Sequence, residues 1–392
     1  MPENKTKNKI IGIDARLYGP VGKGLGRYTQ ELVDNLLELD RENRYVIFLR
    51  RDNFDLLAVD GVRVRKVLAD ARWYTLAEQL TLPWLIARER IDLMHFPHFN
   101  VPIFCPAAFV VTIHDLILLN FPTARASTLG PVLYKIKNAG YRLVISRAVS
   151  RAKKIFAVSQ FTKDDLVRHF KIDAEKVLVT YEGVADFDKA AAGDSPEAGE
   201  KLLGRLGIKK KFLLYVGNAY PHKNLDGLLR IFSELIKKRP ELQLVLVGKD
   251  DYFYERLKTL ATKLGLWRPD AAGPVVFAGY LPDRELKLLY SLSLAYVFPS
   301  FFEGFGLPPL EAMAAGLPVA SSDRTSLPEI LGPAALYFDP DDREQFLSAL
   351  ERISEDQALR FELVRAGREQ VKKYSWRECA RQTLEIYNQL LK

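Results

Sequence analysis

The chain has 392 residues, of which 48% are hydrophobic and 27% charged, so it is too long for one ordinary hydrophobic core and we expect two domains. This composition excludes a disordered or collagenous protein, and two distant cysteines, Cys105 and Cys379, predict neither a disulfide scaffold nor a zinc site. The net charge of +8 comes from residues 1–183, which hold 28 basic and 20 acidic residues, whereas the remainder holds 29 of each.

The N-terminal half contains a strongly basic segment. No acidic residue occurs between Asp115 and Asp164, and the span from Arg125 to Lys163 contains nine Lys and Arg. A field of one sign attracts anionic lipid, a diphosphate-bearing acceptor or nucleic acid. We expect contact with an anionic membrane or acceptor, while a solvated helix face without a partner is the alternative. We expect no nucleic acid partner, because no recognised binding module is present.

Short β-rich runs alternate with longer amphipathic stretches through the first half, which predicts a parallel sheet covered by helices. The polar N-terminus leads straight into the first run, so we expect no signal peptide, no transmembrane helix and a cytoplasmic protein, peripheral at most on the inner face of the membrane. Strands are predicted at Lys9–Asp14, Tyr45–Leu49, Val62–Val67, Leu93–Phe96, Phe109–Ile113, Ile155–Ala157 and Val177–Thr180. A helix is predicted at Tyr28–Leu39.

A polar, small-residue segment then has the composition of a linker, and the alternation restarts after it. The predicted organisation is an N-terminal domain over 1–184, a linker over 185–205, a second domain over 206–373 and a C-terminal helix over 374–392 that returns to the first domain. Strands of the second sheet are predicted at Phe212–Val216, Leu242–Val247, Val275–Ala278, Leu294–Phe298, Pro318–Ser321 and Ala335–Phe338, with helices beginning near Leu225, Tyr252, Asp283, Pro308 and Asp341. Two such units predict a ligand-binding cleft between them.

The most informative motif runs from Phe298 to Gly316. An apolar strand ends, a glycine-rich turn follows, and a helix opens at two prolines, which suit a first helical turn because no amide hydrogen bond is lost there. Such a helix N-terminus presents unpaired N–H groups to a diphosphate or to sugar hydroxyls. Two carboxylates eight residues apart, Glu303 and Glu311, bracket the turn and suit vicinal hydroxyls. The alternative is an ordinary turn with one capping and one exposed glutamate.

Three further segments follow predicted strands. Lys223, in Val216–Leu225, could neutralise charge that builds on a leaving diphosphate, although a lysine in a loop is usually just solvated. A glycine-rich loop at residues 22–26 does not match the dinucleotide-binding fingerprint and is weak evidence alone. His114 ends a strand at the expected cleft edge. On a neighbouring loop, His95, His98 and Asn100 are candidate acceptor-side residues.

Together these segments resemble the family-4 (group 1) retaining glycosyltransferases, over nearly all of residues 9–390. The resemblance implies an α/β fold of GT-B type, in which an acceptor-binding Rossmann-like domain over 1–184 and a nucleotide-sugar-binding Rossmann-like domain over 206–373 face each other across a cleft. It implies that Glu311 binds the ribose hydroxyls of a nucleotide-sugar donor and that Glu303 contacts the transferred sugar. Backbone amides hold the sugar and diphosphate at Gly304, Phe305, Gly306 and Leu307.

The same resemblance assigns the other donor contacts. Lys223 binds the donor phosphates, Gly24 and Gly26 approach the diphosphate, and His114 lies near the anomeric centre. Backbone groups of Tyr280 and Leu281 pack against the donor base, and a plain turn at these residues is the alternative. Many members carry Arg in place of Asn218, which makes that position an uncertain donor contact.

The resemblance implies catalysis by His114, Lys223 and Glu303 and front-face attack on the anomeric carbon. No acidic pair of DxD type lies in a suitable loop at the end of a strand, so we expect no cofactor and no requirement for a divalent metal. The segments look most like mannosyltransferases of surface-polysaccharide pathways, so GDP-mannose is the first choice of donor and a UDP-sugar the second, with a saccharide or lipid-linked acceptor. A non-hydrolysing nucleotide-sugar epimerase and a catalytically silent nucleotide-sugar binder are the rival hypotheses.

Overall fold

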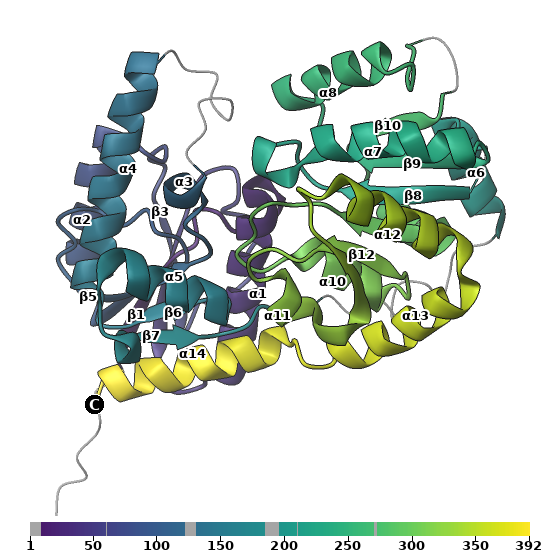
Figure 1. Ribbon diagram of the computed structural model, residues 1–392. Helices are drawn as coiled ribbons and strands as arrows, with labels where there is room; N and C mark the ends of the chain where they lie inside the picture. The colour runs from purple at the N-terminus through teal and green to yellow at the C-terminus, as the bar shows by residue number, and fades with distance from the viewer. Residues whose placement is uncertain (1–8, 60, 122–130, 185–195, 210, 270–272) are drawn as a thin grey trace, which may run out of the picture. The chain divides into compact units, whose positions relative to one another are not determined.

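The computed structural model describes residues 9–59, 61–121, 131–184, 196–209, 211–269 and 273–392 (Figure 1). The chain divides into two compact units. The first comprises residues 1–116, 129–183 and 375–392, and the second comprises residues 117–128 and 184–374. No helix among the described residues is long and apolar enough to cross a bilayer.

The first unit is built on a seven-stranded parallel sheet in the order β3-β2-β1-β4-β5-β6-β7. The strands are β1 (Ile10–Asp14), β2 (Arg44–Leu49), β3 (Val64–Leu68), β4 (Leu93–Phe96), β5 (Ala108–Ile113), β6 (Ile155–Ala157) and β7 (Val177–Val179). Their Val- and Ile-rich runs are buried because helices cover both faces of a parallel sheet. The strand order reverses between β1 and β4, so the loops after these strands flank the point where such sheets bind ligands.

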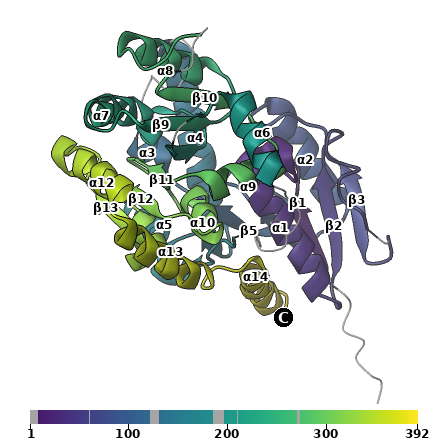
Figure 2. The same cartoon turned by 90° about the vertical axis from the view of Figure 1, so that its right-hand side faces the viewer.

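The first unit contains α1 (Lys23–Leu39), α2 (Leu76–Arg88), α4 (Pro131–Arg151), α5 (Gln160–Phe170) and the C-terminal α14 (Trp376–Leu390), with short 3-10 turns at Pro20–Gly22 and Ala174–Lys176. Helix α14 packs against α1 (Figure 2), although the two are far apart in the chain. Tyr28 of α1 contacts Trp376 edge to face, with ring centroids 5.9 Å apart. The C-terminal helix is thus part of the core of the first unit.

The second unit has a six-stranded parallel sheet in the order β10-β9-β8-β11-β12-β13. Its strands are β8 (Lys211–Val216), β9 (Leu242–Val247), β10 (Val275–Gly279), β11 (Ala295–Phe298), β12 (Val319–Ser322) and β13 (Ala335–Phe338). Its helical elements are α3 (Ile117–Asn120), α6 (Pro196–Leu206), η5 (Pro221–Lys223), α7 (Leu225–Lys238), α8 (Tyr252–Lys263), α9 (Asp283–Leu292), α10 (Leu307–Ala314), α11 (Leu327–Leu331), η6 (Gly332–Ala334), α12 (Arg343–Glu355) and α13 (Gln357–Val371). The strand order reverses between β8 and β11, which places the ends of these strands beside each other.

Two local expectations were wrong. Helix α1 begins at Lys23, so the segment predicted as a glycine-rich loop forms its first turn. A Cβ on Gly26 would lie 2.1 Å from the carbonyl oxygen of Gly19, whereas a Cβ on Gly24 would meet no atom within 4 Å. Gly26 therefore has a packing reason to be glycine. Part of the predicted linker is also helical, because α6 begins at Pro196.

Candidate active site

The turn between β11 and α10 carries the two-glutamate motif. Gly306 adopts φ +102°, a left-handed conformation that favours glycine, and Pro308 and Pro309 lie in the first turn of α10. The Ser326 hydroxyl lies 3.0 Å from the Glu303 carbonyl oxygen and 3.2 Å from that of Phe305. The predicted strand, turn and helix are therefore present, and a hydroxyl from a neighbouring segment holds the turn in place.

Lys223 and Glu303 form a mostly buried ion pair. The Lys223 ammonium lies 2.7 Å and 2.9 Å from the two carboxylate oxygens of Glu303, with side chains 13% and 9% exposed. Lys223 ends the short η5 turn after β8, and the Phe301 amide donates to the His222 carbonyl oxygen at 2.7 Å, which joins the two loops. A mostly buried ammonium held by a carboxylate is a preorganised positive charge.

The other predicted donor residues in the second unit differ in exposure, and so in which of their groups could contact a ligand. Phe305 is buried and packs edge-on against Tyr374, and Leu281 is buried too, so only their backbone groups could reach a ligand. Tyr280 is exposed, and Glu311 lies partly exposed in the middle of α10. Gly304 is buried, whereas Leu307, the first residue of α10, is partly exposed.

Asn218 forms hydrogen bonds with residues close to it in the chain. Its Oδ1 accepts a hydrogen bond from the Tyr220 N–H at 3.3 Å, and its backbone carbonyl accepts one from the Tyr215 hydroxyl at 2.8 Å. Asn218 thereby shapes the loop that leads to Lys223. Among the described residues, no group of three His, Cys, Asp or Glu side chains is placed to hold a metal ion.

His114 follows β5 in the first unit, and both of its ring nitrogens are engaged. Nδ1 lies 3.0 Å from a carboxylate oxygen of Glu182, and Nε2 lies 2.9 Å from the Pro97 carbonyl oxygen. Both partners only accept hydrogen bonds, so the ring satisfies both as a doubly protonated imidazolium. Burial lowers the pKa of His114, but the hydrogen bond and charge of Glu182 outweigh it and hold that pKa above its ordinary value. The two acceptor partners therefore favour His114 as a hydrogen-bond donor through both ring nitrogens rather than as a proton acceptor.

Glu182 is a residue that the sequence reasoning missed. It lies after β7, 5% exposed, and its local sequence carries no motif that marks it as a partner of His114. The only signal was its place at the carboxyl end of a predicted strand, where site residues of parallel sheets gather.

The prediction for His95 as an acceptor-side residue was wrong. Its side chain is fully buried, and its ring bonds to the hydroxyl of Tyr387 on α14 and to Thr112 Oγ1 at 2.9 Å. Burial lowers its pKa to about 3, so it stays neutral. His95 lies within β4, whose pleat directs it into the core, and it ties the C-terminal helix to the sheet.

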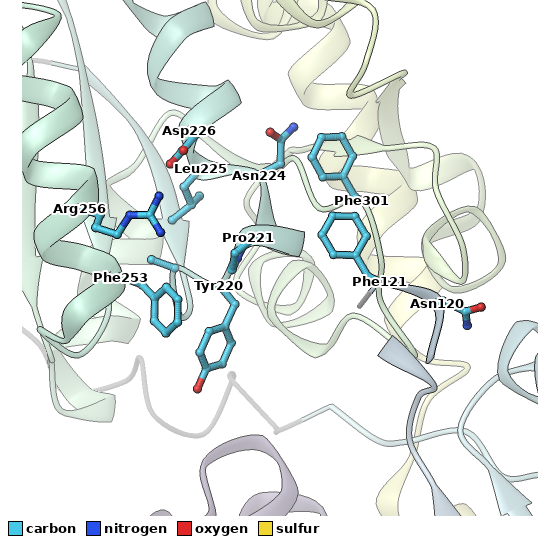
Figure 3. A pocket seen from close by; sticks show the side chains of 11 residues that line it. Asn120, Phe121, Tyr220, Pro221, Asn224, Leu225, Asp226, Phe253, Arg256 and Phe301 are labelled. Carbon is cyan, nitrogen blue, oxygen red and sulfur yellow. The ribbon is translucent and has the colours of Figure 1, made fainter. Parts of the chain in front are cut away.

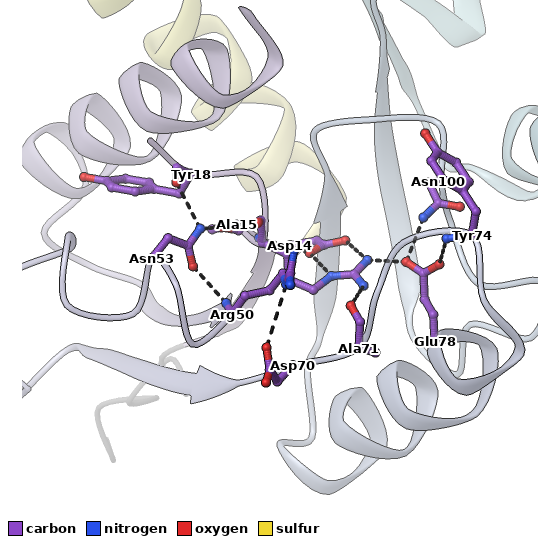
Figure 4. A network of polar contacts seen from close by, with 11 residues as sticks. Asp14, Ala15, Tyr18, Arg50, Asn53, Asp70, Ala71, Tyr74, Glu78 and Asn100 are labelled. Atoms are coloured by element: carbon purple, nitrogen blue, oxygen red, sulfur yellow. Dashed lines mark hydrogen bonds and ion pairs between the residues drawn. The ribbon is translucent and has the colours of Figure 1, made fainter. Parts of the chain in front are cut away.

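His98 and Asn100 lie after β4, next to a buried charge cluster formed by Asp14, Arg16 and Glu78 (Figure 4). Arg16 is 1% exposed and binds Asp14 through Nε and Nη2, both at 2.7 Å, and Glu78 through Nη2 at 2.6 Å. Asn100 donates to Glu78 at 2.7 Å.

The pocket that His98 and Asn100 line in this unit measures about 10 Å³, room for about one water molecule rather than a sugar ring. Burial lowers the pKa of His98 to about 3, with the neighbouring His114 adding to the effect. Asn100 is committed to the charge cluster, which fixes the loop after β1 to the loop after β4.

Two family models match this chain, one in each half. The model described as Glycosyltransferase Family 4 matches residues 22–186, and the model described as Glycosyl transferases group 1 matches residues 202–370. The chain is 29% identical over 392 residues to O-antigen chain mannosyltransferase B of Escherichia coli, an alignment that covers 94% of this chain and 96% of that protein.

Solved structures share the fold. Sucrose-phosphate synthase from Thermosynechococcus elongatus matches with a TM-score of 0.76 at 21% identity, covering 98% of this chain and 99% of that one. The Anabaena protein HepE in complex with UDP-glucose matches with a TM-score of 0.73 at 17% identity, covering 97% and 99%. The expected GT-B fold is thus confirmed. With both halves matched by glycosyltransferase models and the two-glutamate turn in place, the chain belongs to the group 1, family 4 glycosyltransferases.

Proposed function

We propose that this enzyme transfers a mannosyl residue, with retention of configuration, from a nucleotide-diphosphate donor to a saccharide or lipid-linked acceptor in surface-polysaccharide synthesis. GDP-mannose is the first choice of donor and a UDP-sugar the second. The observation that carries the proposal is the buried Lys223–Glu303 pair beside the start of α10. The likeness to the Escherichia coli mannosyltransferase supports mannose as the transferred sugar.

The chemistry requires a stable leaving group. The bond between the anomeric carbon and the phosphate oxygen breaks, and the diphosphate leaves with the electron pair. The Lys223 ammonium and the α10 amides offset the charge that builds there. The acceptor oxygen bonds to the anomeric carbon on the same face, and its proton passes to the departing phosphate oxygen. Glu311 accepts hydrogen bonds from the ribose hydroxyls.

His114 acts in this scheme as a positive charge, because Glu182 and Pro97 already occupy both ring nitrogens. Catalysis then depends on preorganised charge rather than on a protein base. Lys223 supplies the charge that a metal ion provides in other enzymes of this chemical class, so we propose that transfer needs no divalent cation.

The test is transfer of labelled mannose from GDP-mannose, with and without EDTA, by the parent, Lys223→Met and Glu311→Gln. Removing one preorganised donor to the transition state lowers kcat by about 100- to 1,000-fold, so Lys223→Met should lose at least that much. Glu311→Gln should mainly weaken donor binding. Lys372→Met, which changes an exposed lysine just after α13, is the matched control.

Each rival has its own outcome in this assay. Transfer from a UDP-sugar but not from GDP-mannose would identify the UDP-sugar as the donor. Reversible isomerisation without transfer would indicate an epimerase, and binding without turnover would indicate a catalytically silent binder. Folded Lys223→Met and Glu311→Gln variants with parental activity would remove the proposal. Loss of activity in EDTA, restored by a divalent cation, would remove the metal-independent part.

We also propose that the first unit docks on an anionic membrane. The four-residue spacing of Leu76, Leu80 and Trp84 places them on one face of α2, and their side chains are between 60% and 85% exposed. The Arg88 guanidinium lies 4.9 Å from the Trp84 ring centroid. Exposed apolar side chains beside cations suit the headgroup region of a bilayer.

A loop connects α2 to the basic helix α4. The Ile103 amide donates to Gln79 of α2 at 2.9 Å, and its carbonyl accepts from Arg151 of α4 at 2.9 Å. The next residue, Phe104, is exposed. Exposed basic side chains of α4 are Lys135, Lys137, Arg142, Arg147 and Arg151. Arg125, where the basic span begins, lies outside the described residues.

Liposome flotation tests the docking proposal. The parent should float with vesicles containing anionic lipid at low salt, and Leu80→Ser should float less, because it removes the centre of the apolar row. Phe361→Ser, which changes an exposed aromatic residue on α13, is the control. Equal behaviour toward neutral and anionic vesicles at low salt would refute the docking surface.

A further inference from the structure

The second unit contains a pocket of about 520 Å³ (Figure 3), and the same unit carries the Lys223–Glu303 pair proposed to serve the donor. We expect the acceptor on the first unit, the domain role that the family resemblance implies. The pocket that His98 and Asn100 line in the first unit has room for about one water molecule. A saccharide therefore needs an open surface of the first unit rather than that enclosed space.

Three aromatic side chains of the first unit, Tyr74, Phe99 and Tyr141, form an aromatic cluster. The ring centroids of Tyr74 and Phe99 are 6.2 Å apart, and Phe99 meets Tyr141 of α4 edge to face at 4.9 Å. Tyr74 is 62% exposed, and the other two are partly exposed. Tyr74 lies after β3 and Phe99 after β4, so the aromatic cluster lies at the carboxyl edge of the parallel sheet, where such folds bind ligands.

Tyr74 has a strained backbone conformation. Its φ is +64°, in the left-handed region that residues other than glycine rarely adopt. Residues held in this way gather at functional sites, where the surrounding structure keeps them in place. The ring of Tyr74 is largely exposed and adds little to the core, so core packing does not explain why the strained conformation is kept.

The buried charge cluster holds Tyr74 in this conformation (Figure 4). The Tyr74 N–H donates to Glu78 Oε2 at 2.7 Å, and Glu78 Oε1 lies 2.6 Å from Arg16 Nη2. Desolvation offsets much of the attraction within a buried ion pair, so a cluster of this kind is better explained by the positions it fixes than by net stability. What it fixes here is an exposed aromatic ring.

Polar groups border the aromatic cluster. Burial raises the pKa of the Tyr141 hydroxyl, and the negative charge of Asp115 adds to the rise, which places that carboxylate nearby. Asp115 directly follows His114, the residue expected near the anomeric centre. An aromatic face packs on the apolar C–H side of a pyranose ring, while a carboxylate and phenolic hydroxyls suit its hydroxyl groups. A neutral saccharide matches this combination.

We propose that the aromatic cluster of Tyr74, Phe99 and Tyr141 binds a neutral pyranose unit of the acceptor saccharide. This inference rests on the proposed glycosyl transfer and names the side chains that hold its second substrate. The exposed ring of Tyr74 contacts the C–H side of the sugar. Asp115 and the Tyr141 hydroxyl bind its hydroxyl groups.

His98 and Asn100 are positioning residues in this arrangement. The ring centroid of His98 lies 4.0 Å from that of Phe99, and Asn100 donates to Glu78, which in turn holds Tyr74. Both residues therefore act on the acceptor through the aromatic cluster rather than by touching it.

The experiment titrates α-mannobiose into the full-length protein by saturation-transfer NMR, with GDP in excess to fill the donor site. Tyr74→Ala should weaken the affinity about tenfold, the scale of one aromatic contact, and Tyr74→Phe should keep most of it. Tyr74→Gly should weaken binding as much while its Tm stays close to that of the parent, because glycine adopts φ +64° without strain. Tyr252→Ala, which changes an exposed tyrosine of α8, is the matched control and should bind like the parent.

Steady-state transfer to mannobiose gives a second readout. Tyr74→Ala should raise the KM for the acceptor about tenfold and leave kcat and the KM for the donor near those of the parent, because it removes binding that ground state and transition state share. A purely structural role would instead lower Tm and change kcat and the KM for the donor as well.

The outcomes separate this inference from the proposed function. If transfer occurs but the Tyr74 variants bind mannobiose like the parent, or if mannobiose does not bind at all, the inference is wrong and the proposed function stands. If Tyr74→Ala binds mannobiose normally but no longer floats with anionic vesicles, the ring belongs to the membrane-docking surface and the inference is overturned. If mannobiose binding falls as expected but no donor is turned over, the proposed function fails and the saccharide site remains.

Discussion

Replacing Arg16 with Met should be among the most destabilising single changes in the first unit. Arg16 is 1% exposed, and Glu78, one of its two carboxylate partners, is 0% exposed. Removing one partner of a buried ion pair costs about 3–5 kcal/mol, because the remaining charge is left without compensation. Glu78 keeps hydrogen bonds from Asn100 and from the Tyr74 N–H, both at 2.7 Å, so we expect a loss near the lower value.

Urea unfolding followed by tryptophan fluorescence measures this loss. Three of the four tryptophans, Trp73, Trp84 and Trp376, lie in the first unit, so the signal reports mainly on its unfolding. The double variant Arg16→Met with Glu78→Gln should regain part of the lost stability, because it also removes one stranded charge. A loss in Arg16→Met below about 1 kcal/mol, the level of an exposed pair, would refute the reasoning.

Gly26→Ala should destabilise the first unit, because its Cβ would lie 2.1 Å from a backbone carbonyl oxygen, whereas Gly24→Ala should leave thermal unfolding unchanged. A fall in transfer activity in folded Gly24→Ala would then report a ligand contact, and equal Tm values for the two variants would contradict the packing argument. Because the pKa of His114 is raised in the folded protein, its contribution to stability is complete below the unfolded value of about 6.5 and is lost as pH rises through the folded pKa. Glu182→Gln should remove this pH-dependent term, which urea unfolding at several pH values measures, and an NMR titration that gave His114 an ordinary or lowered pKa would contradict it. The contribution of His95 to stability depends on pH in the opposite direction: because its pKa is about 3, stability falls as pH drops from about 6.5 toward 3. His95→Gln should reduce this fall in stability at low pH.

Much of the fold followed from local signals. The predicted strands agree with β1 to β13 to within about two residues, because continuous apolar runs bounded by turn residues are a local signature of buried parallel strands. Helix α8 begins at Tyr252 as predicted, because the Asp251 side chain caps it by accepting hydrogen bonds from the backbone amides of Phe253 and Tyr254. The prolines of α10 mark its start in the same way.

In the candidate site too, some features followed from local sequence patterns and others from contacts between residues distant in the chain. Local patterns predicted that Glu303, Glu311 and Lys223 follow strands of one sheet, because strand ends and turn residues are encoded within a few positions. The fold was needed to show that Lys223 and Glu303, 80 residues apart, form an ion pair, and that Glu182 bonds to His114 across 68 residues. His95 is likewise buried, because Tyr387, 292 residues away in the chain, packs over it. Burial and charge pairing depend on partners that are distant in the chain, and no local pattern of residues specifies them.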